Sequence, residues 1–415
     1  MNGTKAQLGF SVAAQFVRYG APILFYPIFI RYASAADFAI FVLCMAAGQT
    51  VGQFTEFGFG LSAVRELAAR EGNPEEASLA CGQVICGKLL MFLLTAPVYI
   101  LIASFGQGQI DLFQTILLPL FIGLSYGFTP NWYYIGTKKA HALATAEVLI
   151  SLAQLAAVLI FIRPGSGFFL ITMTMAVPVF CFSVFGQIAA IRSISFKRPS
   201  RSELWAATRT AYHFFIATSS PALMNKLFIL VLGSWSSATQ IAYYAAGERL
   251  ASAGINTLTP IVRVLLPRMT QIYNRSKQEG YFWFRRTFAI LSVLYFGGAL
   301  FGAILAPWWV PLVFEDAFTP AVPTIALLLF AVPFSVTGRI VGILYLVPAK
   351  MEKVYQRMTL LACVAGAALA IPAAIYGSMT VVVLRLAVEI AIFAGCIFIF
   401  RRLRKSEVSE YSAGN

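Results

Sequence analysis

Long apolar runs dominate the chain and determine its expected architecture. A helix needs roughly 20 mostly apolar residues to cross a lipid bilayer, and twelve runs meet that requirement. They cover residues 8–30, 38–60, 79–103, 112–134, 141–162, 168–191, 211–232, 240–265, 287–306, 320–347, 354–376 and 379–400. Only short polar connections remain between them. We therefore predict an all-α integral membrane protein with about twelve transmembrane helices.

The polar connections alternate in charge along the chain. If the N-terminus lies in the cytoplasm, the cytoplasmic connections hold 22 of the 31 Lys and Arg residues. The opposite connections hold only Arg31 and Arg163. An excess of Lys and Arg marks the cytoplasmic side of a membrane protein. We therefore predict that both termini are cytoplasmic.

The most polar connection, near residues 192–210, divides the apolar runs into two equal sets. With six runs on each side, we predict one six-helix lobe over residues 1–200 and another over 201–400, followed by a basic cytoplasmic tail at 401–415. Many transporters bind their substrate between two such halves.

Composition agrees with a membrane protein and argues against a nucleic-acid-binding protein and against a metal site of cysteine and histidine. Of all residues 59% are hydrophobic and 12% are charged, and the net charge is +14. The basic residues lie at the ends of apolar runs, where membrane orientation explains them, so we exclude nucleic-acid binding. The six cysteines lie inside apolar runs, and none has metal-ligand spacing with His141 or His213. We expect no metal and no cofactor.

Several charged residues fall inside the apolar runs, where each costs on the order of 3 kcal/mol unless it faces protein, water or a partner. Arg18, Lys226 and Arg249 lie deepest, and Arg339 is a fourth candidate. Because guanidinium and ammonium groups attract phosphate oxygens, we predict that these four cations line an anion-binding cavity.

Ion pairing is the alternative explanation for these charges. Glu56 and Glu248 also lie within runs and could neutralise nearby cations. Arg385 and Glu389 are one helical turn apart, so we expect them to pair with each other. Lys88 lies about midway along its run, and a small shift of that run's boundary would bring it toward the cytoplasmic surface.

Four segments, in this order and spacing, resemble the Wzx-type polysaccharide flippases of the MOP (multidrug/oligosaccharidyl-lipid/polysaccharide) exporter superfamily. The first is RYASAADFAI at 31–40, and the third is PNWYYIGTKK at 130–139. The fourth is YYAAGERL at 243–250, followed by PIVRVLLPRM at 260–269. The second matches the family's aromatic-glycine-aromatic exit and the charged turn after it, at Phe57, Gly58, Phe59, Arg65, Glu66, Leu67 and Ala68.

The resemblance implies a MOP/MATE-like fold with a central cavity lined by the first, second, seventh and eighth spans. It implies a flippase, not an enzyme, in the bacterial inner membrane. Such a protein translocates an undecaprenyl-diphosphate-linked oligosaccharide by alternating access for O-antigen or exopolysaccharide biosynthesis. Besides membrane lipids, a polysaccharide polymerase and a chain-length regulator become candidate partners. Glu56 and Glu248 become candidates for ion coupling, and candidates for stacking on sugar rings are Tyr133, Tyr243 and Tyr244.

Three other functions compete with this interpretation. A cation-coupled multidrug exporter of the same fold would favour carboxylates over the basic excess found inside these runs. A peptidoglycan-precursor flippase usually has fourteen spans. A membrane polymerase or glycosyltransferase acting on lipid-linked sugars tends to carry a long outer loop or an acidic motif. The longest outer loop here, about residues 306–319, holds only Glu315 and Asp316 as acids.

Overall fold

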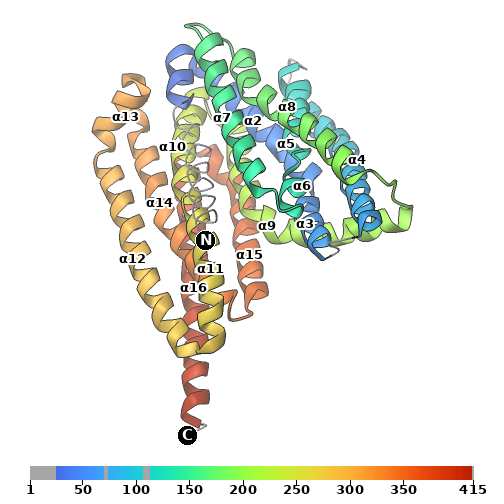
Figure 1. Ribbon diagram of the computed structural model, residues 1–415. Helices are drawn as coiled ribbons and strands as arrows, with labels where there is room; N and C mark the ends of the chain where they lie inside the picture. Colours follow the sequence, from blue (N-terminus) through green and yellow to red (C-terminus); the bar gives the residue numbers. More distant parts are fainter. Residues whose placement is uncertain (1–24, 70–72, 106–112, 414–415) are drawn as a thin grey trace. The chain divides into compact units, whose positions relative to one another are not determined.

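The computed structural model describes residues 25–69, 73–105 and 113–413. Within these residues the chain is helical throughout and contains no β-strand (Figure 1). It forms two compact units, Met1–Ala242 and Tyr243–Asn415, which we call unit 1 and unit 2. The seventh predicted run, 211–232, thus belongs to unit 1. The division at residue 200, which rests on counting spans, stays a prediction.

The helices confirm the prediction of an all-α membrane protein. Among the described residues, eight helices are long and apolar enough to cross a membrane, and two bent helix pairs raise the number to ten. These ten correspond to ten of the twelve predicted runs. Of the other two, run 8–30 lies mostly outside the described residues, and run 112–134 is a broken helix.

Unit 1 contains eight α-helices among its described residues, several of them short. They are α2 (Ala35–Glu56), α3 (Phe59–Ala69), α4 (Pro74–Phe105), α5 (Leu118–Gly127), α6 (Asn131–Gly136), α7 (Ala140–Phe161), α8 (Phe168–Ile194) and α9 (Arg201–Trp235), and a π-helical turn, η1 (Phe113–Leu117), precedes α5.

Local sequence determines where two of these helices, α2 and α9, begin. The Ser34 hydroxyl accepts the Asp37 N–H at the start of α2, and Ser200 with Glu203 forms a capping box at the start of α9.

Glycines bring α2 and α5 into backbone contact. A Cβ added at Gly48 would lie 2.4 Å from the Cβ of Ile122, and one at Gly52 would lie 3.2 Å from the carbonyl oxygen of Gly123. On the other helix, a Cβ at Gly127 would lie 2.6 Å from the Cβ of Thr55. Small residues four apart allow such close approach between membrane helices. We call Gly48, Gly52, Gly123 and Gly127 the glycine seam.

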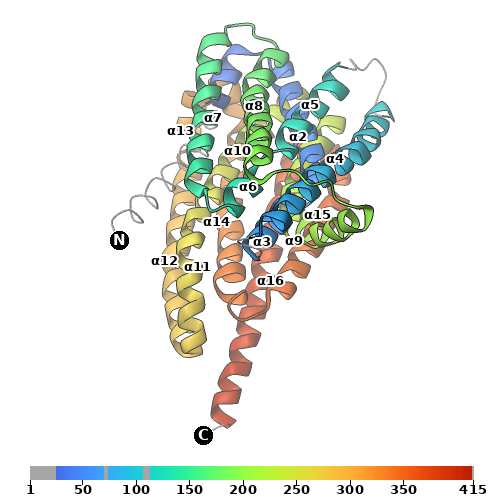
Figure 2. The ribbon, with the colours of Figure 1, turned by 45° about the vertical axis from the view of Figure 1, so that its right-hand side comes forward.

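Unit 2 is built around α14 (Val322–Val341), whose side chains at Ile325, Leu328, Val336 and Ile340 are fully buried. Around it lie α10 (Ala238–Asn256), α11 (Leu258–Arg275), α12 (Lys277–Ile304), α13 (Ala306–Phe314), α15 (Glu352–Ile375) and α16 (Ser378–Ala413). A 3-10 helix, η2 (Asp316–Ala321), precedes α14, and a π-helix, η3 (Gly342–Leu346), follows it. Figure 2 shows that α16 extends past the ends of its neighbours α12 and α15.

Two long helical stretches bend, one within α9 and one within α11, and a proline explains the position of each bend. The halves Arg201–Ile216 and Ser219–Trp235 of α9 meet at 67°, and Ala238–Val262 and Val264–Arg275 meet at 49°. Proline lacks an N–H and its ring clashes with the carbonyl four residues earlier. Pro221 and Pro267 place that carbonyl at residues 217 and 263, within the two breaks.

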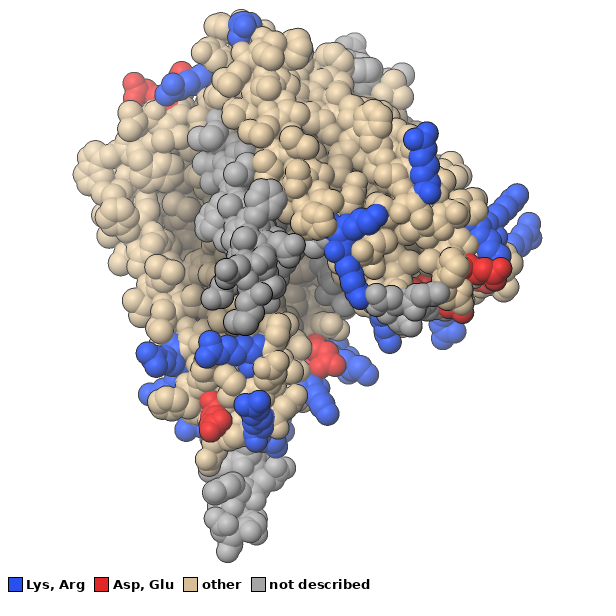
Figure 3. Space-filling view, in the orientation of Figure 1, with Lys and Arg blue, Asp and Glu red and all other residues tan. Residues whose placement is uncertain are grey.

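The surface of unit 2 agrees with a membrane environment. In the face shown in Figure 3, basic side chains gather at the lower end of unit 2, where α11, α12 and α16 end or begin, and the described surface of unit 2 above that end is mostly uncharged. Large apolar side chains stay exposed along the helices, for example Val293 at 74% and Leu294 at 63% on α12. An exposed apolar surface with charges at its rim is typical of an integral membrane protein.

Candidate functional site

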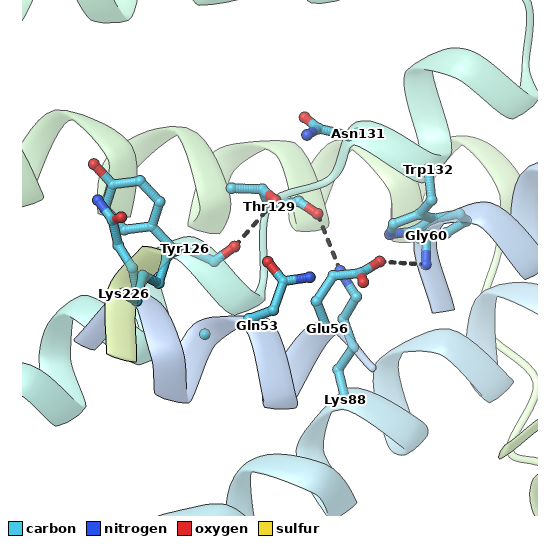
Figure 4. A pocket seen from close by; sticks show the side chains of 11 residues that line it. Gln53, Glu56, Gly60, Lys88, Tyr126, Thr129, Asn131, Trp132 and Lys226 are labelled. Carbon is cyan, nitrogen blue, oxygen red and sulfur yellow. Dashed lines mark hydrogen bonds between the residues drawn. The ribbon is translucent and has the colours of Figure 1, made fainter. Parts of the chain in front are cut away.

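Unit 1 contains a polar pocket with a volume of about 300 Å³ (Figure 4). Residues of α2, α3, α4, α5, α6 and α9, with Thr129 from the connection between α5 and α6, form its walls. The lining residues are Gln49, Gly52, Gln53, Glu56, Gly60, Lys88, Tyr126, Thr129, Asn131, Trp132 and Lys226. It combines three charged side chains with three carboxamides.

The first helix break beside the pocket explains the position of Glu56. Helix α2 ends at Glu56, and the next residues, Phe57 with φ 44° and Gly58 with φ 81°, adopt left-handed backbone conformations before α3 begins at Phe59. The first N–H groups of a helix have no partner within it. The Glu56 carboxylate accepts the Gly58 N–H at 2.9 Å and the Gly60 N–H at 2.6 Å. A negative group at a helix N-terminus is stabilised by the helix dipole.

The second break explains Lys88. Helix α5 ends at Gly127 and α6 begins after Pro130, which has no N–H to continue the helix. The released Thr129 carbonyl oxygen accepts a hydrogen bond from Lys88 Nζ at 3.2 Å. Lys88 is 1% exposed and lies in the middle of α4, not near either end. Sequence reasoning left Lys88 out of the site, although its charge within an apolar run was the signal that could have identified it.

Lys226 completes the charges of the pocket. It lies on α9, five residues after Pro221, and in Figure 4 it is next to Tyr126, with Gln53 between it and the Glu56–Lys88 end. Of the residues predicted from sequence, the structure brings Glu56 and Lys226 into one pocket. The lining carries two lysines and one glutamate, which is a formal net charge of +1.

Carboxamides supply the uncharged polar groups. Gln49 and Gln53 are one turn apart on α2, and Asn131 begins α6. Gln53 Nε2 donates a hydrogen bond to the Ser219 hydroxyl of α9 at 2.9 Å, so it also joins the two helices. Sequence reasoning did not select these residues, because an amide in a membrane helix is less unusual than a charge.

Unit 2 holds a buried ion pair of its own. Arg385 of α16 is 1% exposed, and its Nη1 lies 3.7 Å from Oε1 of Glu248 on α10, whose side chain is 15% exposed. The Ser252 hydroxyl donates a hydrogen bond to the same Glu248 oxygen at 2.5 Å. The ion-pair partner of Arg385 is thus Glu248, and not Glu389 one turn along α16 as the sequence suggested. Internal pairing, the alternative that the sequence left open, applies to Glu248.

The other predicted cations lie elsewhere. Arg249, beside Glu248 on α10, and Arg339 on α14 are both half-buried in unit 2. Arg18 lies outside the described residues. The role of these cations in substrate binding stays a prediction.

Two of the three predicted stacking tyrosines are buried in this conformation. Tyr133 is 4% exposed, packs in a cluster with Trp132, and its hydroxyl accepts a hydrogen bond from Lys139 Nζ at 3.0 Å. Tyr244 is fully buried in unit 2. Tyr243 donates a hydrogen bond to the Ala317 carbonyl at 3.0 Å, with its ring against Phe318. Stacking of these residues on sugars stays a prediction.

A polar pocket formed at helix breaks within the membrane is characteristic of transporters, whose discontinuous helices line binding sites. The solved inward-facing structure of a multidrug resistance MATE family transporter of the MOP superfamily has the same fold. Its TM-score is 0.70 at 16% identity, over 95% of this chain and 96% of that one. The chain thus shares the fold of that MOP-superfamily structure. No group of three side chains suited to a metal occurs among the described residues.

The family model described as "Polysaccharide biosynthesis protein" matches residues 5–273, and the chain belongs to this family. It is 22% identical to "Putative O-antigen transporter" of Escherichia coli (strain K12) over 291 residues, 68% of each chain. It is 21% identical to a protein of the same name from Shigella dysenteriae over 343 residues, 80% of each chain. The family resemblance carried by the sequence motifs is thereby confirmed.

Proposed function

We propose that this chain translocates an undecaprenyl-diphosphate-linked oligosaccharide across the bacterial cytoplasmic membrane for the assembly of O-antigen or exopolysaccharide. One observation carries the proposal. The segment that matches the polysaccharide biosynthesis family, residues 5–273, contains every residue of the charged pocket in unit 1. The names of the two curated relatives support the same substrate class.

The proposed mechanism is alternating access with both termini in the cytoplasm. The lipid-linked sugar enters from the cytoplasmic side, its acyl chain stays in the bilayer, and a conformational change exposes the sugar to the outer side. Arg18, Lys226, Arg249 and Arg339 supply positive charge for the substrate. A polymerase and a chain-length regulator then act on the product, and they are the protein partners we propose.

Glu56 and Glu248 are the proposed groups for coupling to an ion gradient. Each has partners in the described structure: two backbone N–H groups for Glu56, and Arg385 with Ser252 for Glu248. Coupling through either carboxylate therefore requires that a conformational change release those partners.

A cation-coupled drug exporter is the second candidate, because a multidrug transporter shares the fold. That likeness, at 16% identity, concerns the fold alone. The pocket argues for the first candidate, since two lysines and one glutamate line it. The net positive charge of this lining repels an organic cation.

Complementation of a deletion strain tests the proposal. Lys226→Ala and Arg249→Ala should each lower surface polysaccharide on the order of 10- to 100-fold at unchanged membrane abundance, because a hydrogen bond to a charged group contributes about 1.5–3 kcal/mol. Lys226→Arg should retain most activity. Lys353→Ala, at an exposed lysine of α15, is the matched control.

Two outcomes would contradict the proposal in different ways. Full complementation by both alanine variants would exclude the cationic residues as substrate contacts. A deletion strain with normal surface polysaccharide and increased sensitivity to organic cations would instead identify the chain as a drug exporter.

A further inference from the structure

The charges of the unit 1 pocket are arranged so that most of them serve the protein's own backbone. Glu56 neutralises the start of α3 through the N–H groups of Gly58 and Gly60. Lys88 neutralises the end of the broken α5 segment through the Thr129 carbonyl. These two opposite charges line the same small pocket, where each also offsets the other.

This arrangement is unsuited to a diphosphate. A lipid diphosphate carries at least two negative charges, and a pocket of about 300 Å³ would hold them close to the fixed carboxylate of Glu56. Like charges at short range repel each other. The formal net charge of +1 matches a ligand group with at most one negative charge.

The uncharged lining is suited to hydroxyl groups. Gln49, Gln53 and Asn131 each present a carbonyl oxygen that accepts and an NH₂ group that donates, so they can pair with a hydroxyl in either direction. Gln53 uses one donor on Ser219 and keeps its carbonyl oxygen as an acceptor. Tyr126, whose side chain also lines the pocket, adds a hydroxyl and an aromatic ring face.

The volume sets the size of the ligand. A cavity of about 300 Å³ corresponds to about ten water molecules. It has room for one or two sugar rings and not for a whole oligosaccharide with its lipid.

We propose that this pocket is a saccharide subsite: it binds one sugar ring, neutral or with a single negative charge, through Gln49, Gln53 and Asn131. The inference rests on the proposed function, because the ring belongs to the lipid-linked oligosaccharide. The diphosphate is bound outside this pocket, by the proposed cations other than Lys226, and Lys226 within the pocket supplies the positive charge for a singly charged sugar.

Binding measurements on the purified full chain in nanodiscs separate the two parts of the substrate. One probe is the oligosaccharide released by mild acid from the host strain's lipid-linked intermediate, followed by saturation-transfer NMR. The other is undecaprenyl diphosphate without sugar, followed by native mass spectrometry. Gln49→Ala/Gln53→Ala should weaken oligosaccharide binding at least tenfold and leave undecaprenyl diphosphate binding unchanged.

Controls exclude a folding defect. Gln271→Ala/Gln278→Ala, at two exposed glutamines of unit 2, makes the same chemical change away from the pocket and should leave both ligands bound. Gln49→Ala alone keeps the bond between Gln53 and Ser219, so it should weaken oligosaccharide binding in a protein of unchanged thermal stability.

The outcomes distinguish the subsite from the function. If the pocket variants bind the oligosaccharide like the wild-type chain, or if they lose undecaprenyl diphosphate instead, the saccharide subsite is wrong while the proposed function stands. If the wild-type chain binds neither probe and its deletion leaves surface polysaccharide intact, the proposed function itself is wrong.

Discussion

Replacing Arg385 by glutamine should destabilise unit 2, because it leaves the Glu248 carboxylate inside the helix bundle without its counter-ion. Arg385 is 1% exposed and lies 3.7 Å from Glu248. At an effective dielectric constant of about 20, two unit charges at this distance attract by about 4.5 kcal/mol. Protonating a carboxylate at pH 7 costs about 3.7 kcal/mol, which is less. Because protonation is the cheaper of the two, it limits the loss in the free energy of unfolding to about 3–4 kcal/mol. That value lies within the range known for broken buried ion pairs.

Equilibrium unfolding in mixed detergent micelles, followed by circular dichroism, measures this loss. Arg357→Gln, at an exposed arginine of α15, is the matched control and should stay within about 0.5 kcal/mol of the wild-type chain. The double variant Arg385→Gln/Glu248→Gln should recover most of the stability, since no unpaired charge remains. A single variant as stable as the wild type, or a double variant with the sum of both losses, would refute the reasoning.

Two further predictions concern unit 1, and the same unfolding measurement checks both. Glu56→Ala removes the acceptor of two backbone N–H groups and should lower the free energy of unfolding by about 2–4 kcal/mol. Glu56→Gln keeps one acceptor oxygen, so its loss should be about half as large. Equal losses in the two variants would contradict the capping role. Gly48→Ala places a Cβ 2.4 Å from Ile122 and should cost about 1–3 kcal/mol. At Gly298 an added Cβ would meet no side chain or neighbouring helix within 4 Å among the described residues, so Gly298→Ala should be neutral or slightly stabilising. A similar loss at both glycines would contradict the close contact between α2 and α5.

The fold was largely predictable because hydropathy is a local property. A run of about 20 apolar residues needs no knowledge of its neighbours to be identified as a membrane helix. Run 112–134 shows the limit of this approach. Its composition is mostly apolar, yet the structure breaks it between α5 and α6 at Pro130. Composition averaged over a window does not register a single residue that lacks an N–H.

The site was predicted only in part, because its contacts join residues distant in sequence. Lys88 and Thr129 are 41 positions apart, so nothing local indicated that one satisfies the other. Likewise, Arg385 has Glu389 one helical turn away, but its partner in the structure is Glu248 on another helix. Charges within apolar runs were correct indicators of an embedded polar site. Which carboxylate a cation meets depends on packing between helices.

The glycine seam has a consequence for how substrate preference can change in this family. Gly48 and Gly52 bring α2 against the backbone of α5, and both helix breaks follow at the ends of these two helices. The pocket's location is therefore determined by main-chain contact. Gln49 and Gln53 are the next residues along α2, about 100° around the helix. The seam glycines and the two glutamines thus lie on adjacent faces of one helix, which meet at Gly52. The proposed sugar-binding positions can therefore be exchanged between homologues without repacking the seam.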